Sequence, residues 1–575
     1  MSEKTKKLSI SFDGFGGIDH DLAHSQKTVA NDIVNFRITK DGTLKKRPGY
    51  RLLSDLGSDI RAFYSLPVDG KPLLFALCNN KLISIDPQSG NQEILGFVNS
   101  SVGRAPFFSY RGKLFLADGS QLYKYSDGVL ISVIGYIPLL GENWGPNVPG
   151  EVLESRNLIT DYARLTYVVP KLSTPFFHSK YPVKSVQAVY VNGLRIPEDR
   201  YEINKRFTTV DILDLYEGDR VEVHLEYTPI LDSLKNRLLK SHSAALFGSS
   251  GYMGIFLCGG NGSHIVFPSV FVDTLSLEKS QTFIPESDIV YFPEYAQFEV
   301  GDGMHEIKAV VRHRNKILIF TESDVWMTSP EIINKENIPA VSINATIGCA
   351  ADNGAISVKN DTVSLGKNGV WLWSGDADDQ HSCSATNISD QINDELCLHG
   401  ISNCGIFFDQ FNSELWVYSK ISDIAWIYNT ENRSWYKYRG ISAENMISLD
   451  NRIAFTSNGK IFILDEANSH DIPGDGEALP IEAYYHSSVN DFGSEKLKNL
   501  TSISLRADLH GEPLSLGFEC DNGESYEFSV TAPISEEHSV ISKRLFSGRF
   551  RCTGIKIRSS SLGPQAIHRL TVTAR

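Results

Sequence analysis

The sequence predicts an all-β protein: a six- or seven-bladed β-propeller with an inserted β-sandwich module and a C-terminal β-sandwich-like domain. Hairpin units recur at intervals of roughly 40–50 residues, the spacing of propeller blades. The 575 residues include 30 Phe, 23 Tyr and 45 Gly but only 5 Met, which favours many short strands joined by turns. Only residues 231–240, LDSLKNRLLK, show the apolar spacing of an amphipathic helix.

The N-terminal region is expected to lead into the first blade. Residues 1–30 predict an extended arm, because FDGFGGIDHDLAH is rich in glycine and acidic residues and too irregular for a helix. The pattern then alternates through NFRIT, the dipeptide Asp41–Gly42 and TLKKRPGYRLL. An Asp-Gly step supplies the positive φ angles of a tight turn, so a hairpin is predicted. Residues 31–150 are assigned to the first part of the propeller.

Six segments share the order of polar turn, apolar strand and turn. They are Phe63–Ile94, Phe107–Ile134, 310–329, 362–376, 405–438 and 446–467. Because helical spacers are missing between these units, a propeller is favoured over the alternative, a generic meander of antiparallel strands. Residues 231–475 are assigned to the remainder of the propeller.

Two segments interrupt this rhythm. Residues 151–230 contain alternating runs such as VEVHLEY and follow the Pro/Gly-rich stretch GENWGPNVPG, which predicts a small inserted β-sandwich. After the turn cluster HDIPGDGEALP, residues 476–575 hold a second series of strands, including LSLGFEC and HRLTVTA. This series predicts a separate C-terminal β domain.

Charge and cysteine content restrict the functional classes. A net charge of −14 argues against a protein that coats nucleic acid, since phosphate neutralisation needs an excess of Lys and Arg. An acidic surface can still line a DNA passage, where repulsion prevents sticking. The eight cysteines form no CxxC pair and lie mostly in apolar, strand-like runs, which predicts buried free thiols in a reducing compartment. The N-terminus MSEKTKKLSISF has no signal-peptide stretch, and no segment reaches membrane-spanning length.

Two segments have some features of metal sites. His20 and His24 in HDLAH have the i, i+4 spacing of a metalloprotease helix, but glycines precede them, so a solvated arm is expected. The second segment, GDADDQHSC, lacks the glycine and distal glutamate of an EF-hand loop and predicts an acidic loop at a blade edge. Its residues of metal-ligand type are Asp376, Asp378, Asp379, His381 and Cys383.

Other motifs give no support for catalysis. GFGG (14–17) and CGGNGS (258–263) lack the spacing of phosphate-binding loops, and no GxSxG elbow is present. The basic run KKRPG (45–49) could contact a DNA backbone, but its Pro-Gly turn favours a hairpin at the start of a domain. The chain is therefore predicted not to be an enzyme, with no catalytic, cofactor-binding or metal-binding residues and no cofactor assigned.

A glycan-binding or glycan-cleaving propeller is the alternative from another functional class. The repeated SxDxGxTW turn of sialidases is absent, with TKDGT (39–43) and YSDGV (125–129) as the nearest segments, and no carboxylate pair can be nominated. Four aromatic residues could stack on a glycan, but their alternating strand positions favour packing between blades. These residues are Trp416, Trp426, Trp435 and Tyr438.

The stretch from Phe12 to Tyr50 contains GFGGID (14–19), NFRIT (35–39) and DGTLKKRPG (41–49). This order resembles the opening of bacteriophage tail nozzle and packaged-DNA stabilisation (head-completion) proteins with a β-propeller core. Later segments are similar as well, although each is short and none is a catalytic signature. They are KILIFTESDVW (316–326), IYNTENRSWYKY (427–438), DFG (491–493) and DNG (521–523).

The resemblance implies a virion structural protein of the phage tail, assembled in the host cytoplasm. Its copies would form a homo-oligomeric ring, with a hexamer expected, that extends the DNA channel used in ejection. Implied partners are adaptor or connector proteins, tail fibres or spikes, and double-stranded DNA in transient passage, with no membrane insertion. Cyclic symmetry requires heterologous contacts, which the arm and the two sandwiches are expected to supply, while surplus acidic residues are expected to face the lumen.

Overall fold

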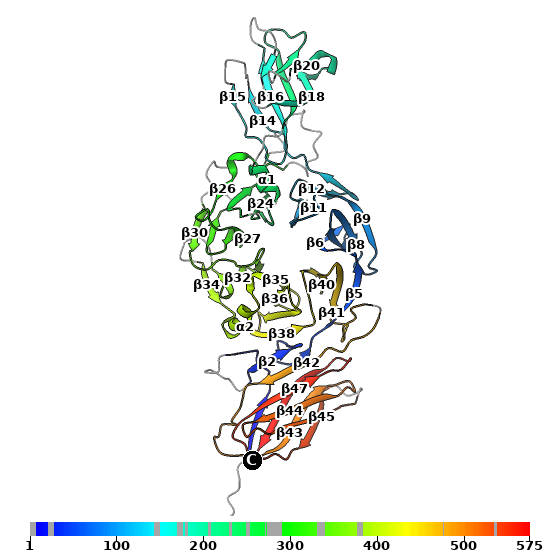
Figure 1. The fold of residues 1–575 in the computed structure, drawn as a ribbon, viewed down its shortest axis with the longest axis vertical. Helices are drawn as coiled ribbons and strands as arrows, with labels where there is room; N and C mark the ends of the chain where they lie inside the picture. Colours follow the sequence, from blue (N-terminus) through cyan, green and yellow to red (C-terminus); the bar gives the residue numbers. More distant parts are fainter. Residues whose placement is uncertain are drawn as a thin grey trace, which may run out of the picture.

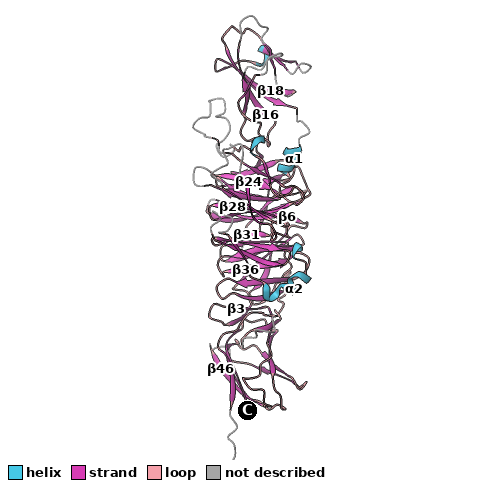
Figure 2. Ribbon diagram, turned by 90° about the vertical axis from the view of Figure 1, so that its left-hand side faces the viewer, coloured by secondary structure: helices cyan, strands magenta, loops and turns pink. Residues whose placement is uncertain are grey.

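The computed structural model is an elongated all-β molecule, in which a propeller lies between two smaller β modules (Figure 1). The modules project from opposite rims of the propeller, and the side view shows all three parts in line (Figure 2). The structure describes residues 7–20, 28–68, 70–142, 150–169, 176–178, 182–204, 209–228, 233–248, 253–260, 262–270, 272, 290–329, 340–375, 383–474, 476–533 and 538–575.

Within these residues, seven four-stranded antiparallel units form the propeller. The first blade contains β6 (Ile60–Val68), β7 (Lys71–Cys78), β8 (Lys81–Ile85) and β9 (Gln92–Phe97). The second contains β10 (Phe107–Tyr110), β11 (Lys113–Ala117), β12 (Leu122–Ser126) and β13 (Val129–Ser132). The third contains β23 (Ser243–Phe247), β24 (Gly254–Cys258), β25 (Ile265–Pro268) and β26 (Phe298–Glu299). The fourth blade contains β27 (Ile307–His313), β28 (Lys316–Thr321), β29 (Val325–Thr328) and β30 (Ala340–Asn344). The fifth contains β31 (Ala355–Val358), β32 (Asp361–Gly366), β33 (Gly369–Ser374) and β34 (Ser384–Asn387). The sixth contains β35 (Cys404–Asp409), β36 (Glu414–Ser419), β37 (Ile424–Asn429) and β38 (Ser434–Arg439).

The seventh blade joins two distant parts of the chain. Its inner strands are β39 (Asn445–Leu449), β40 (Arg452–Ser457) and β41 (Lys460–Asp465), and β5 (Gly49–Asp55) pairs antiparallel with β41 as the outer strand. An early strand thus closes the ring, and closure removes strand edges that would otherwise pair with other chains. The predicted propeller is confirmed, with seven blades in the described part of the chain.

The predicted hairpin units correspond to blade strands. Asn79, Arg111 and Arg314 have φ angles of 53°, 49° and 53° in the NN, RG and RN turns, as tight turns between antiparallel strands require. The blade formed by β23–β26 was not among the predicted units. A long connection separates its last two strands, so its repeat is not visible in the sequence.

The inserted module begins earlier than predicted. Its larger sheet contains β14 (Leu139–Glu142), β15 (Glu151–Val152), β16 (Tyr162–Val168), β18 (Val183–Val191), β19 (Leu194–Arg195) and β22 (Arg220–Tyr227). Its smaller sheet contains β17 (Phe176–His178), β20 (Tyr201–Asn204) and β21 (Thr209–Ile212). Strands before residue 151 therefore belong to the insert and not to the propeller. Conversely, Leu158 and Ile159 lie inside the predicted insert but are buried among propeller residues, because the chain returns to the rim between β15 and β16.

The C-terminal sandwich is built from both ends of the chain. One sheet contains β1 (Leu8–Phe12), β3 (Phe36–Ile38), β4 (Leu44–Lys46), β43 (Leu500–Asp508), β46 (Ser539–Arg544) and β48 (Ala566–Ala574). The other contains β2 (Ala30–Val34), β42 (Ala483–Ser487), β44 (Leu514–Cys520), β45 (Ser525–Val530) and β47 (Thr553–Ser559), and is continuous with blade strand β38 through β2.

This arrangement corrects one boundary. The hairpin at 36–46 lies in the sandwich and not in the propeller, whereas residues 8–12 of the predicted extended arm lie against β48 as a sheet strand. The physical reason is burial: Phe12 and Phe36 are completely buried in a cluster that includes Leu570 and Val572 of β48. Alternation in the sequence shows that one face of a strand is buried, but it does not identify the covering sheet.

Helices are few. α1 (Ser233–Leu239) confirms the predicted helical segment, and α2 (Asn393–Leu398) and four short 3₁₀ turns complete the described helical elements. The 3₁₀ turns are η2 (Glu198–Arg200), η6 (Glu294–Ala296), η8 (Asp390–Ile392) and η9 (Ile401–Asn403). None of the helices in the described ranges has the length and apolar character that a membrane crossing requires.

We predict that the insert can be removed without unfolding the propeller. Its buried cluster contains only its own residues, and its ends are adjacent, since the Tyr227 amide donates to the Asp161 carbonyl at 3.0 Å. Replacing residues 162–226, which hold the insert strands from β16 to β22 and leave only its short edge strands β14 and β15, with a two-glycine linker should therefore leave one cooperative unfolding transition in calorimetry. Loss of that transition would show that the insert supports the propeller core.

Candidate functional site

The KKRPG motif forms a buried junction between the sandwich and the propeller. Arg47 is 2% exposed, and its guanidinium donates to both carboxylate oxygens of Asp471, at 2.9 and 2.6 Å. It also donates to the side-chain oxygen of Asn35 and to the carbonyls of Pro48 and Arg439. Every N–H group of this side chain is thus used, which a buried guanidinium needs in order to be stable.

Lys46 is buried beside it and donates to the Ser561 carbonyl at 2.6 Å. Burial lowers the pKa of Lys46 to about 8, and the nearby Arg47 also lowers it. The prediction that KKRPG marks the start of a domain is confirmed. The alternative, a DNA-backbone contact, would need exposed cations, whereas only Lys45 of the three basic residues is substantially exposed.

A second buried charge cluster lies where β3 faces the blades. Arg37 makes a two-point contact with Glu466, at 2.6 and 2.9 Å. Glu414 is 4% exposed, and its carboxylate accepts a hydrogen bond of 2.6 Å from the Tyr436 hydroxyl. Burial raises the pKa of Glu414 to about 7, although Arg37 opposes the shift. Burial also raises the pKa of Glu466, but Arg37 and Lys45 outweigh it and the net shift is downward.

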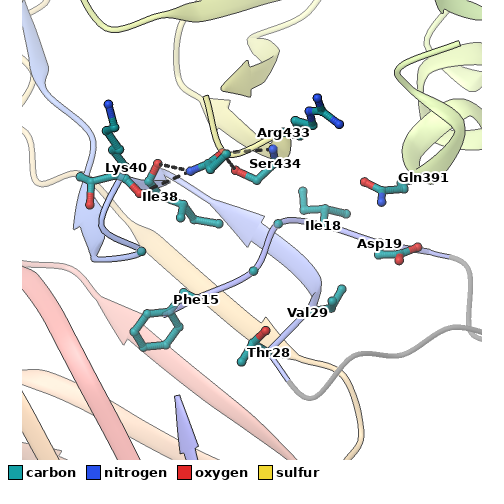
Figure 3. Close-up of a pocket in the computed structure, with 15 residues that line it drawn as sticks. Phe15, Ile18, Asp19, Thr28, Val29, Ile38, Lys40, Gln391, Arg433 and Ser434 are labelled. Atoms are coloured by element: carbon teal, nitrogen blue, oxygen red, sulfur yellow. Dashed lines mark hydrogen bonds between the residues drawn. The ribbon is translucent and has the colours of Figure 1, made fainter. Parts of the chain in front are cut away.

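A cavity of about 220 Å³ lies beside this junction, between the N-terminal segment and the sixth blade (Figure 3). The Asn432 amide donates to the carbonyls of Ile38 and Thr39, at 3.3 Å each. A Cβ on Gly17 would lie 2.8 Å from atoms of Ser434 and the backbone of blade strand β38. Gly17 is therefore needed where the backbone packs closely against the blade, and a Cβ on Gly16 would lie 2.8 Å from the Thr28 carbonyl oxygen.

The inner strands of the seven blades surround a central cavity of about 500 Å³. This volume is typical of small-molecule sites. The polar and charged residues of the lining are Arg61, Arg104, His242, Ser243, Asp352, Asn353, Lys420, Glu444 and Asn445.

An ion pair crosses the propeller axis in this cavity. Arg104 precedes β10 in the second blade and Asp352 precedes β31 in the fifth, and their charged groups are 3.2 Å apart. Asp352 also binds Lys308 at 3.0 Å, and Lys308 binds Glu306 at the same distance. Because these residues come from blades on different sides of the ring, the network of ion pairs bridges the central cavity.

Two basic side chains give the cavity a capacity for small anions. His242 is 7% exposed, and neither ring nitrogen has a hydrogen-bond partner among the described residues. Burial lowers its pKa, as it does for Lys420, where the charge of Arg104 also contributes. Burial disfavours the charged forms of His242 and Lys420, and a small anion between them would accept hydrogen bonds from both and stabilise those charged forms. The CGGNGS turn packs against this imidazole, because a Cβ on Gly259 would lie 2.5 Å from the His242 ring.

The structure does not bring the predicted metal-site candidates together in the described chain. His20 lies 4.0 Å from Glu395, but Asp21 and His24 are outside the described residues. Cys383 is half-buried. The other residues of its loop, Asp376, Asp378, Asp379 and His381, also lie outside the described residues.

The aromatic residues considered for glycan stacking are buried. Trp416, Trp426, Trp435 and Tyr438 are at most 1% exposed, so the prediction of packing within the propeller is confirmed. All eight cysteines are free. Five of them are buried as predicted, Cys383 and Cys552 are intermediate, and Cys397 is exposed.

Sequence reasoning missed the central network. Arg104, His242 and Asp352 occupy loops before the inner strands of three different blades. Their only sequence signal is a polar residue just before an apolar strand, and many positions in this chain share that signal.

No family model and no curated protein matches this chain. Among solved structures, BamB from Moraxella catarrhalis is 8% identical with a TM-score of 0.32, over 80% of this chain and 99% of that protein. The Cps50 (Swd1) β-propeller domain from Myceliophteria thermophila is 9% identical with a TM-score of 0.34, over 70% and 96%. PorZ from Porphyromonas gingivalis is 9% identical with a TM-score of 0.33, over 84% and 46%.

We predict that breaking the junction pair destabilises the protein strongly. Asp471→Ala leaves the Arg47 guanidinium buried without its counter-ion and should cost about 3–5 kcal/mol in urea unfolding. Lys45→Ala is the control: its ion pair with Glu466 is 40% exposed on the lysine side and should contribute less than about 1 kcal/mol. Equal losses in the two variants would contradict a dominant role for Asp471.

We predict that pH changes the stability of the protein in opposite directions through two carboxyl groups of the second charge cluster, Glu414 and Glu466. Because the folded-state pKa of Glu414 is raised, its ionisation destabilises the native state progressively as pH rises from about 4.5 toward about 7. Glu414→Gln should therefore be more stable than wild type at pH 8, with the difference vanishing at acidic pH.

Glu466→Gln should show the reverse. The pKa of Glu466 is lowered in the folded state. Its ionised carboxylate therefore adds to the free energy of unfolding at pH values above the unfolded-state pKa, and this stabilisation is lost as the pH falls through the folded-state pKa. This variant should be less stable than wild type at pH 8 and approach wild type in acid. Urea unfolding across the pH range measures both variants, and slopes of the same sign would refute the assignment.

Proposed function

We propose that this protein is a structural component of a bacteriophage tail, of the nozzle or head-completion class. In this proposal its copies form a ring, with a hexamer expected, that extends the DNA channel and contacts connector proteins and fibres or spikes. The protein acts mechanically in the virion after assembly in the host cytoplasm.

The observation that carries the proposal is the continuous sheet between propeller and sandwich. Strand β2 pairs parallel with β38 of the sixth blade, at Val34 and Lys437, and antiparallel with β42 of the sandwich. Lys437 also binds Asp32 at 2.7 Å. The propeller and the sandwich therefore have no flexible linker between them at this point, which suits a subunit that transmits load.

Exposed apolar side chains at both ends support contacts with neighbours. Leu194 and Tyr216 of the insert are each 75% exposed, and Phe546 and Val540 of the sandwich are 90% and 69% exposed. The proposal assigns these side chains to contacts with neighbouring proteins, which would remove their apolar surface from water. Two different end surfaces also meet the need of a cyclic ring for heterologous contacts.

The central cavity bears on the path of DNA. The Arg104–Asp352 pair joins loops of two blades across the central cavity, so the proposal does not route a duplex through a single propeller. In the proposed assembly DNA passes through a lumen between subunits, and the net charge of −14 reduces adhesion to that lumen.

The test is a nonsense allele of the gene in the phage that encodes it. We expect particles made without the protein to fill with DNA and then lose it, and complementation with the full-length chain to restore retention. Electron microscopy of labelled wild-type particles should locate several copies at the head–tail vertex.

Two results would overturn the proposal. One is absence of the chain from purified particles. The other is release of sugar from host envelope by the purified protein, which would favour the glycan-cleaving alternative. Native mass spectrometry of the full chain supplies the copy number.

A further inference from the structure

Three metal-ligand side chains meet at one end of the sandwich sheet that contains both chain ends. Asp508 ends β43, His568 lies on the neighbouring strand β48, and His538 immediately precedes β46 on the other side. One ligand atom from each lies within 4.8 Å of the others. Strand pairing, and not a mobile loop contact, therefore sets the spacing of Asp508 and His568.

The distances suit one small cation. His568 Nε2 lies 2.8 Å from Asp508 Oδ2, and His538 Nδ1 lies 3.6 Å from Asp508 Oδ1. Tetrahedral zinc with bonds of 2.0–2.2 Å separates its nitrogen and oxygen ligands by roughly 3.3 Å. The two distances bracket this value, so a shift of about half an ångström would complete the geometry.

The hydrogen bonds around His568 favour a cation at this point. The Thr43 hydroxyl donates its single proton to Asp41 at 2.8 Å, and the same oxygen lies 3.2 Å from His568 Nδ1. Nδ1 must then be the donor to Thr43, which leaves the lone pair of a neutral Nε2 facing the Asp508 carboxylate. Such a contact is repulsive unless a proton or a metal ion lies between the two atoms.

The surroundings match those of a metal-bound histidine. Metal-binding imidazoles usually donate their other ring N–H to an oxygen that is itself held in place, as Thr43 is by Asp41. Asp508 is 17% exposed and His538 48%, so a metal can enter from solvent.

We propose that Asp508, His538 and His568 bind a divalent transition-metal ion, with zinc as the best match. Two imidazoles and one carboxylate select Zn²⁺ and its neighbours over Mg²⁺ or Ca²⁺, which prefer oxygen ligands. The ion connects β48, β43 and the start of β46, and through Thr43 it also stabilises the N-terminal hairpin. A fourth position faces solvent and takes a water molecule. The site is independent of the proposed tail function.

The test is calorimetric titration of the full-length chain with ZnCl₂. We expect one ion per chain and a higher melting temperature with zinc, because a ligand that binds only the folded state stabilises it. His538→Ala removes an exposed ligand without opening the core and should weaken binding about tenfold or more. Thr43→Val removes only the supporting hydroxyl and should weaken binding about ten- to a hundredfold.

His305→Ala is the matched control. His305 lies 3.1 Å from Asp302 in an exposed pair, and the described residues supply no third ligand beside it, so its loss should change zinc affinity less than twofold. Cobalt spectra of the wild type should show nitrogen and oxygen ligation. Zinc binding that survives His538→Ala, a cobalt–thiolate band, or no binding to the wild type would each overturn the proposal.

Discussion

The buried pair between Arg47 and Asp471 lies at the point where the chain passes between propeller and sandwich. Arg47 directly follows the sandwich hairpin and lies two residues before Gly49, where the strand that closes the ring begins, and Asp471 follows the last inner strand of the seventh blade. Asn35 lies between β2 and β3. Its side-chain oxygen accepts a hydrogen bond from the Arg47 guanidinium, and its side-chain amide donates one to the Glu482 carbonyl. Ring closure and attachment of the sandwich therefore depend on the same group of hydrogen bonds.

This shared junction makes the two ends of the chain interdependent. Leu8 pairs with Ala574, and β4 pairs with the same terminal strand. The sheet of the sandwich cannot form until the last residues have been made, and such non-local pairing makes folding slow. The final structure is correspondingly stiff, since a single sheet runs from the sixth blade into the sandwich. Stiffness is the property that the proposed role in a phage tail requires.

Charge is distributed in a way that net charge does not reveal. The chain is acidic overall, yet the propeller axis holds Arg104, Lys308 and Lys420 together with Asp352. The side chains of Lys308 and Asp352 are only 12% and 32% exposed, so solvent and salt screen their charges less than those of exposed acidic residues. The Arg104–Asp352 pair joins loops of the second and fifth blades across the central cavity.

The all-β class, the propeller hairpins, the single predicted helix and the burial of Trp416 and Trp426 follow from local patterns. Turn residues and alternation depend on neighbours in the sequence, so they are readable there. Tertiary structure alone decided that residues 8–12 and 30–46 join the C-terminal sandwich, that β5 closes the ring, and that Asp508, His538 and His568 converge. Those outcomes depend on which distant strand covers an apolar face, and a period-2 pattern carries no information about its partner.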